Sequence, residues 1–217
     1  MGNVLSDSNL CCARSSKVKA ELEKFKTRLQ SCNKKLDSLV QEEIDLLFGA
    51  VDVDGSNALD AEETKVLVGK LEERGFEFEG DISDFDKDGD GNFDKDEVSF
   101  AVRAALRERP KNLELISSKI EDIDILSRDA WDLIDVTRDG FISIPELSMF
   151  YSDLGKVMDE KPPSYQDILE LTRKYDTDSD SVLTYEEFEM LFCDFLCRTA
   201  FKPEQFSVDS GSDTEKP

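Results

Sequence analysis

Histidine is absent from this chain of 217 residues, and basic residues are few relative to acidic ones. Without imidazole, the chain has no histidine for acid–base catalysis, for zinc–histidine sites or for a pH switch near neutrality. Lys and Arg number 27 against 50 Asp and Glu, which gives a net charge of −23. Because nucleic-acid phosphates would be repelled, this balance excludes nucleic acid as an expected partner. The carboxylates must be dispersed over the surface or neutralised by bound cations.

Cysteine and long apolar runs are also scarce. The five cysteines are an odd number without the spacing of a disulfide framework, which fits a reducing compartment. No run of apolar residues approaches the roughly 20 that a membrane span needs. The N-terminus lacks the apolar core of a signal peptide, and no nucleophile–base constellation is recognisable. We therefore expect a soluble, intracellular protein that is not an enzyme.

Acidic residues are concentrated in four stretches that share one pattern. Oxygen-bearing side chains occupy positions 1, 3, 5, 9 and 12, and a bulky apolar residue occupies position 8. Calcium takes about 6–8 oxygen ligands. In this pattern the ligands come from alternating side chains, a backbone carbonyl at position 7 and a bidentate glutamate at position 12. The pattern therefore predicts up to four calcium sites. The stretches are 52–63, 86–97, 135–146 and 176–187, hereafter loops one to four.

Loop two, with the sequence DKDGDGNFDKDE, fits this pattern best. It has five carboxylates at ligand positions and Gly91 at position 6, where the backbone must be left-handed. Loop one has four such carboxylates and Asn57 at position 6, which visits left-handed backbone more easily than most residues. The predicted ligands of loops one and two are Asp52, Asp54, Ser56, the carbonyl of Ala58, Asp60, Glu63, Asp86, Asp88, Asp90, the carbonyl of Asn92, Asp94 and Glu97.

Loops three and four depart further from the pattern. Loop four has four carboxylates but Ser181 at position 6, whereas loop three has Gly140 there and only three carboxylates, because Thr137 replaces one. We expect loop two to bind calcium most tightly and loop three least; loop three alternatively serves as a structural loop without calcium at resting concentrations. The predicted ligands of loops three and four are Asp135, Thr137, Asp139, the carbonyl of Phe141, Ser143, Glu146, Asp176, Asp178, Asp180, the carbonyl of Val182, Thr184 and Glu187.

Apolar residues at helical spacing flank each loop, so the predicted fold class is all-α, with four helix–loop–helix units. The apolar residue at position 8 is expected to form a short β-bridge to a partner loop. The widest gap between loop starts lies between loops two and three, which indicates pairing of one with two and of three with four. We therefore predict one lobe over residues 39–109, a second over 110–202, and a disordered acidic tail over 203–217.

A basic amphipathic helix is predicted over residues 15–38, before the first lobe. Residues 13–36 contain eight Lys or Arg and only two acidic residues. The basic face is suited either to an anionic membrane or to docking in cis on the acidic lobes. Apolar residues spaced by three and four form one stripe: Val18, Leu22, Phe25, Leu29, Cys32, Leu36 and Leu39.

The first residues carry a lipidation pattern, and we predict a flexible acylation segment over 1–14. The start MGNVLS fits the M-G-x-x-x-[ST] acceptor pattern for myristoylation of Gly2, and Cys11 and Cys12 suit palmitoylation. One acyl chain attaches a protein only marginally, whereas a second chain or a polybasic patch makes attachment stable. This predicts a location at the cytoplasmic face of a membrane with a cytosolic fraction; the alternative is an unmodified start.

Over roughly residues 40–200, the four loops resemble those of the EF-hand superfamily of calcium-binding proteins. With the Gly2 start, the chain is similar to acylated sensors such as neuronal calcium sensors, calcineurin B and calflagins. The resemblance implies that calcium opens helix pairs and exposes an apolar surface to a target helix, an enzyme subunit or a membrane. We predict a membrane-anchored calcium sensor or adaptor. The alternatives are a cytosolic calcium buffer and a calcium-binding regulatory subunit of an enzyme such as a phosphatase.

Overall fold

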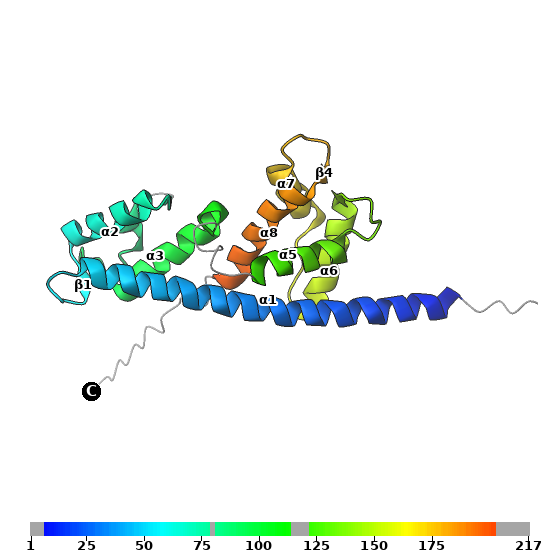
Figure 1. Cartoon of the computed structure of the whole chain (residues 1–217), viewed down its shortest axis with the longest axis horizontal. Coiled ribbons are helices and arrows are strands. Elements are labelled where there is room, and N and C mark those ends of the chain that lie inside the picture. Colours follow the sequence, from blue (N-terminus) through cyan, green and yellow to red (C-terminus); the bar gives the residue numbers. More distant parts are fainter. Residues whose placement is uncertain (1–6, 79–80, 114–121, 203–217) are drawn as a thin grey trace, which may run out of the picture. The chain divides into compact units, whose positions relative to one another are not determined.

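The chain is built almost entirely from helices in the computed structural model, which describes residues 7–78, 81–113 and 122–202 (Figure 1). The predicted all-α class is confirmed. Gly2 and the predicted tail at 203–217 lie outside the described residues. None of the helices in these ranges is both long enough and apolar enough to span a bilayer. The elements are α1 (Asp7–Val51), α2 (Ala61–Glu73), η1 (Ile82–Phe85), α3 (Lys95–Glu108), η2 (Pro110–Leu113), α5 (Asp122–Ile134), α6 (Ile144–Met158), α7 (Tyr165–Tyr175) and α8 (Tyr185–Ala200).

Short antiparallel strands join the loops in pairs. β1 (Ala58–Leu59) pairs with β2 (Phe93–Asp94), and β3 (Ile142–Ser143) pairs with β4 (Val182–Leu183). The position 8 residues face one another, Leu59 opposite Phe93 and Ile142 opposite Leu183, and all four are buried. The predicted pairing of loop one with two and of three with four is therefore confirmed.

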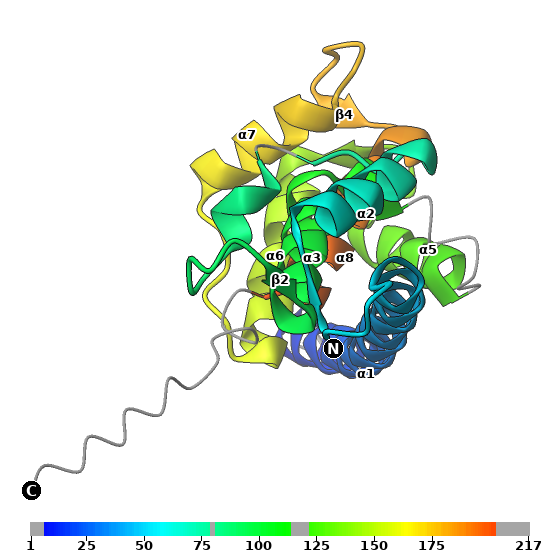
Figure 2. The same cartoon turned by 90° about the vertical axis from the view of Figure 1, so that its left-hand side faces the viewer.

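Helix α1 differs from the prediction at both ends. It runs without interruption from Asp7 to Val51, so residues 15–38 are not a separate helix and residues 7–14 are helical. Figure 2 views it nearly along its axis, as one continuous coil. The reason is that no Gly or Pro lies between Gly2 and Gly49, and buried apolar residues continue past Leu36 at Val40, Ile44, Leu47 and Val51. The basic segment thus leads directly into loop one.

The chain divides into two compact units, each with one pair of loops. Unit 1 comprises residues 1–36 and 116–195, with loops three and four, and unit 2 comprises residues 37–115 and 196–217, with loops one and two. Helices α1 and α8 therefore contribute residues to both units. The predicted division at residues 38, 109 and 202 assumed contiguous segments. In the structure, each unit instead combines two segments that are far apart in sequence.

The core of unit 1 combines an aromatic cluster with the first half of α1. Phe188 is 1% exposed, and its ring centroid lies 5.5 Å from that of Trp131 and 5.7 Å from that of Phe192. The predicted stripe on α1 is buried from Leu22 to Leu36, whereas Leu39 is half-buried and Val18 is 40% exposed and lies outside the core. The buried stripe residues of this unit are Leu22, Phe25, Leu29, Cys32 and Leu36.

Unit 2 contains a buried cation that ties α3 to the second half of α1. Arg103 on α3 is buried, and its guanidinium donates to a carboxylate oxygen of Asp37 at 2.8 Å and to the amide oxygen of Gln41 at 3.0 Å. A buried charge is costly unless it is paired and hydrogen-bonded. These two contacts therefore fix α3 against α1. The apolar core around them includes Ile44, Leu47, Phe48, Leu67, Val98, Val102 and Leu106.

Candidate metal centre

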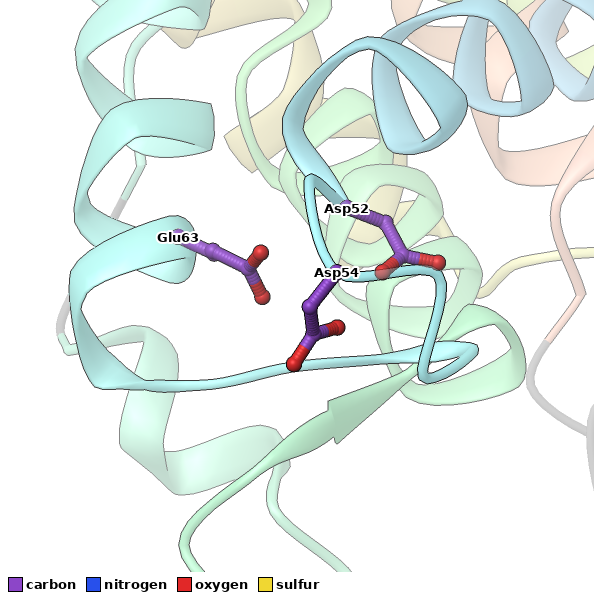
Figure 3. A group of neighbouring side chains, drawn as sticks. All are labelled: Asp52, Asp54 and Glu63. Carbon is purple, nitrogen blue, oxygen red and sulfur yellow. The ribbon is translucent and has the colours of Figure 1, made fainter.

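Loops one, two and four each bring three carboxylates together. In each group the ligand oxygens lie within 4.8 Å of one another. Figure 3 shows Glu63 extending from α2 toward the loop segment that carries Asp52 and Asp54. A set of oxygen-only donors with several negative charges fits a hard divalent cation such as calcium. The groups are Asp52, Asp54 and Glu63; Asp86, Asp88 and Glu97; and Asp176, Asp178 and Glu187.

The glutamate at position 12 is held from both ends of its loop. In loop two, Oε1 of Glu97 accepts the Lys87 N–H at 2.8 Å, and Oε2 accepts the Asp94 N–H at 3.0 Å. The carboxylate is thereby oriented with both oxygens available to one ion. It also connects the beginning of the loop to its end. The equivalent donors are Val53 and Asp60 for Glu63, and Thr177 and Thr184 for Glu187.

The same glutamate belongs to the first turn of the exiting helix. Asp94 is the N-cap of α3 and accepts the Glu97 N–H at 2.8 Å, so the two residues form a capping box. The same motif is formed by Asp60 with Glu63 at α2 and by Ser143 with Glu146 at α6. The loop pattern predicted these residues only as ligands, although the spacing [DST]-x-x-E was the signal for this second role. Moving the glutamate must therefore move the helix start.

Two backbone positions in every loop have left-handed geometry. Position 6 was predicted to need it, and φ there is 63° at Asn57 and 72° at Ser181, despite their side chains. Position 4 was not predicted, yet its φ is 70° at Gly55 and 57° at Arg138. The glycines of loops one and two at position 4 were the available signal. These turns direct amide N–H groups inward; for example, the Gly91 N–H donates to Asp86 Oδ2 at 3.0 Å.

Loop three is arranged differently because Thr137 stands at position 3. Its hydroxyl donates to Oε1 of Glu146 at 2.9 Å, and its N–H donates to the same oxygen at 3.1 Å. The Ser143 hydroxyl donates to Oε2 at 2.7 Å. The oxygens of Glu187 in loop four accept hydroxyl groups in the same way, from Thr177 and Thr184, so loop three differs in having Thr137 in place of a carboxylate at position 3. Among the described residues, the close groups of three carboxylates lie in loops one, two and four. That loop three binds calcium least stays a prediction.

Hydrogen bonding and charge set the ionisation of these carboxylates. Burial raises the pKa of Glu146, but the hydrogen bonds from Ser143 and Thr137 outweigh it and lower the pKa to about 2. The Thr184 N–H, with the bonds from Thr177, likewise lowers the pKa of Glu187 to about 2 against the effect of burial. For Asp178, the Asp180 N–H lowers the pKa, yet burial and repulsion from Asp180, Glu187 and Asp176 raise it overall. A bound cation would relieve this repulsion.

Replacing Thr137 with Asp should raise the calcium affinity of loop three by about tenfold, because it adds a fourth carboxylate and removes the hydroxyl that holds Glu146. Titration calorimetry of the full chain measures the affinity of the weakest site. Thr137→Val is the control, since it removes the hydroxyl without adding a ligand oxygen or a charge and should give no gain in affinity. An unchanged weakest site in Thr137→Asp would contradict the assignment of position 3 as a ligand.

Comparisons with known proteins agree with this geometry. The family described as an EF-hand domain pair matches residues 127–193, which contain loops three and four, and an EF-hand family matches residues 44–68, which contain loop one. A probable calcium-binding protein of Oryza sativa subsp. japonica, CML13, is 29% identical over 153 residues, or 68% of this chain and 79% of that protein. The calcium-binding protein CML19 of Arabidopsis thaliana is 29% identical over 153 residues, covering 68% and 80% of the two chains. A probable calcium-binding protein of the same plant, CML20, is 32% identical over 119 residues, covering 52% and 62%.

Proposed function

Because this chain is an EF-hand calcium-binding protein, we propose that it acts as a calcium sensor with a regulatory role rather than as a buffer or an enzyme. The observation that carries the proposal is the double role of the position 12 glutamate. In loop two, Glu97 bridges the two ends of the loop and also belongs to the first turn of α3. When this carboxylate turns toward an ion, the start of the helix turns with it. Sensor EF-hands convert calcium binding into a helix movement of this kind, whereas buffer EF-hands barely open.

The helices that follow the loops carry apolar side chains suited to such a signal. On α8, Glu187 is followed directly by Phe188, and both Phe188 and Phe192 are buried. A change in the direction of α8 would bring part of this aromatic surface to solvent. The relatives named above are calcium-binding proteins by name, which supports calcium binding by this chain.

A hydrophobic dye tests the sensor proposal on the full chain. Calcium should raise the fluorescence of the dye, and chelation should reverse the rise. Glu187→Gln should lose a substantial part of the response because it removes a ligand that also starts α8. Glu189→Gln is the matched control, since Glu189 is exposed on the same helix. Calcium binding without any dye response would instead identify a buffer.

We further propose that acylation at Gly2 and at Cys11 or Cys12 attaches the sensor to the cytoplasmic face of a membrane, with a cytosolic fraction. Myristoylation alone is marginal, and a second acyl chain or basic residues strengthen it. Lys17, Lys19 and Lys24 are exposed on α1 near the lipidation segment and suit an anionic surface. Co-sedimentation of acylated wild-type and Gly2→Ala protein with anionic vesicles, with and without calcium, tests this. Wild-type protein that stays in the supernatant under both conditions would refute the attachment.

A further inference from the structure

Hydroxyl groups distinguish the position 12 glutamates of unit 1 from those of unit 2. In loop four, Oε1 of Glu187 accepts the N–H and the hydroxyl of Thr177, both at 2.7 Å, and Oε2 accepts the N–H and the hydroxyl of Thr184, both at 2.9 Å. The glutamate of loop three likewise accepts one N–H and one hydroxyl on each oxygen. In loops one and two, the N–H groups that reach Glu63 and Glu97 come from residues without a hydroxyl.

These hydroxyl groups compete with calcium for Glu187. A carboxylate has about four lone-pair directions, two on each oxygen, and the donors from Thr177 and Thr184 account for all of them. Because the ligand at position 12 is bidentate, each oxygen must keep one direction for the ion. Glu187 therefore binds through both oxygens only when one donor leaves each of them. The N–H groups are fixed by the backbone of the loop, whereas a hydroxyl rotates, so the hydroxyls are the donors that leave.

The two hydroxyls differ in what replaces their bond to Glu187. Thr184 occupies position 9 and is a predicted ligand, so its oxygen can serve the same ion once its proton turns away from the glutamate. Thr177 occupies position 2, which supplies no ligand in the loop pattern. Its side chain is exposed, so its hydroxyl exchanges the carboxylate for water. The loss of this bond is therefore a moderate cost of calcium binding, with no gain of a ligand to offset it.

We propose that Thr177 determines the calcium affinity of loop four from outside the ligand set: its hydroxyl holds Oε1 of Glu187 and thereby weakens binding. Loops one and four each have four carboxylates at ligand positions, so charge alone would give them similar affinities. The hydroxyl of Thr177 makes loop four the weaker of the two. Loop one of unit 2 then fills at a lower calcium concentration than loop four of unit 1. The chain responds to calcium over a wider concentration range than equal loops would allow.

This role of Thr177 goes beyond the sensor proposal and does not need it, because it concerns the affinity of a loop and not the movement of a helix. Calcium affinity and calcium-dependent dye binding are separate measurements. A chain without any dye response can still show the expected changes in affinity, and the reverse also holds.

Substitutions at position 2 that keep the shape of the side chain test the proposal in both directions. Thr177→Val removes the hydroxyl, keeps the N–H donor and should raise the calcium affinity of loop four about fivefold. Thr177→Ser keeps a hydroxyl and should stay close to wild type. Val53→Thr adds a hydroxyl to loop one, where the Val53 N–H donates to Oε1 of Glu63 at 2.8 Å and the side chain is 87% exposed. It should lower the affinity of loop one by a similar factor.

Titration calorimetry of the full chain reads one loop at a time when the position 12 glutamates of the other three are replaced by Gln. For loop four these changes are Glu63→Gln, Glu97→Gln and Glu146→Gln. The same position 2 variants in the otherwise native chain keep the test decisive if this background folds poorly, because one calcium-binding constant should still shift in each. Unchanged or weaker binding in Thr177→Val, an equal gain in Thr177→Ser, or unchanged binding in Val53→Thr overturns the proposal.

Discussion

Replacing Glu97 with Gln is expected to abolish calcium binding at loop two in the micromolar range, lowering its affinity by about 100-fold or more. Glu97 is buried, and its two oxygens accept the N–H groups of Lys87 and Asp94. Glutamine keeps the size of the side chain but loses its charge, and its NH2 group must face one of these donors. Titration calorimetry at micromolar free calcium should lose one equivalent of binding.

Loop one should also weaken in this variant, because β1 pairs with β2 and places Leu59 opposite Phe93. Asp96→Asn is the matched control: it removes one negative charge from the same first turn of α3, at an exposed side chain. We expect its affinity to stay within about twofold of wild type, as a surface charge acts only weakly. Equal losses in the two variants would mean that net charge, and not coordination by Glu97, accounts for binding.

Replacing Phe188 with Ala should lower the free energy of unfolding of unit 1 by about 3–5 kcal/mol, the usual cost of a large cavity in a packed core. The ring is 1% exposed and contacts those of Trp131, Tyr185 and Phe192. Trp131 is the single tryptophan of the chain, and its ring centroid lies 5.5 Å from that of Phe188. Denaturant unfolding followed by tryptophan fluorescence therefore measures the stability of this unit directly.

Met190→Ala provides the comparison for this experiment. Met190 lies on α8 two residues beyond Phe188 and is 38% exposed, so its truncation should cost less than about 1 kcal/mol. If both variants shift the fluorescence transition equally, then Phe188 is not the centre of this core. Loop four should lose affinity in Phe188→Ala alone, because Glu187 precedes the cavity in the same helical turn.

The loops were predictable because their chemistry is local. A calcium shell needs oxygen donors at fixed intervals within about 12 residues. Asp86, Gly91 and Glu97 follow that requirement without help from the rest of the chain. The bridge partners followed from it too, since the position 8 side chains need burial and the loops lie in pairs.

Other features depended on residues that are distant in sequence. Lys35 meets Asp122 across 87 residues, and Lys26 meets Val157 across 131. The basic segment is suited both to docking in cis and to membrane binding, so its composition left the two alternatives open. The role of Thr137 was equally hidden. Its hydroxyl counts as a ligand oxygen in the pattern, yet it donates to Glu146.

The separation between α1 and the helices it packs against also affects how the protein is made. Arg28 leaves the ribosome 101 residues before Asp129. At about 5–20 residues per second, that interval lasts roughly 5–20 seconds. For most of it, α5 and α6 have not been made, and the stripe from Leu22 to Leu36 has no partner from them on the nascent chain. A chaperone or a membrane surface that covers apolar segments therefore has its best opportunity to bind this protein during translation, before unit 1 is complete.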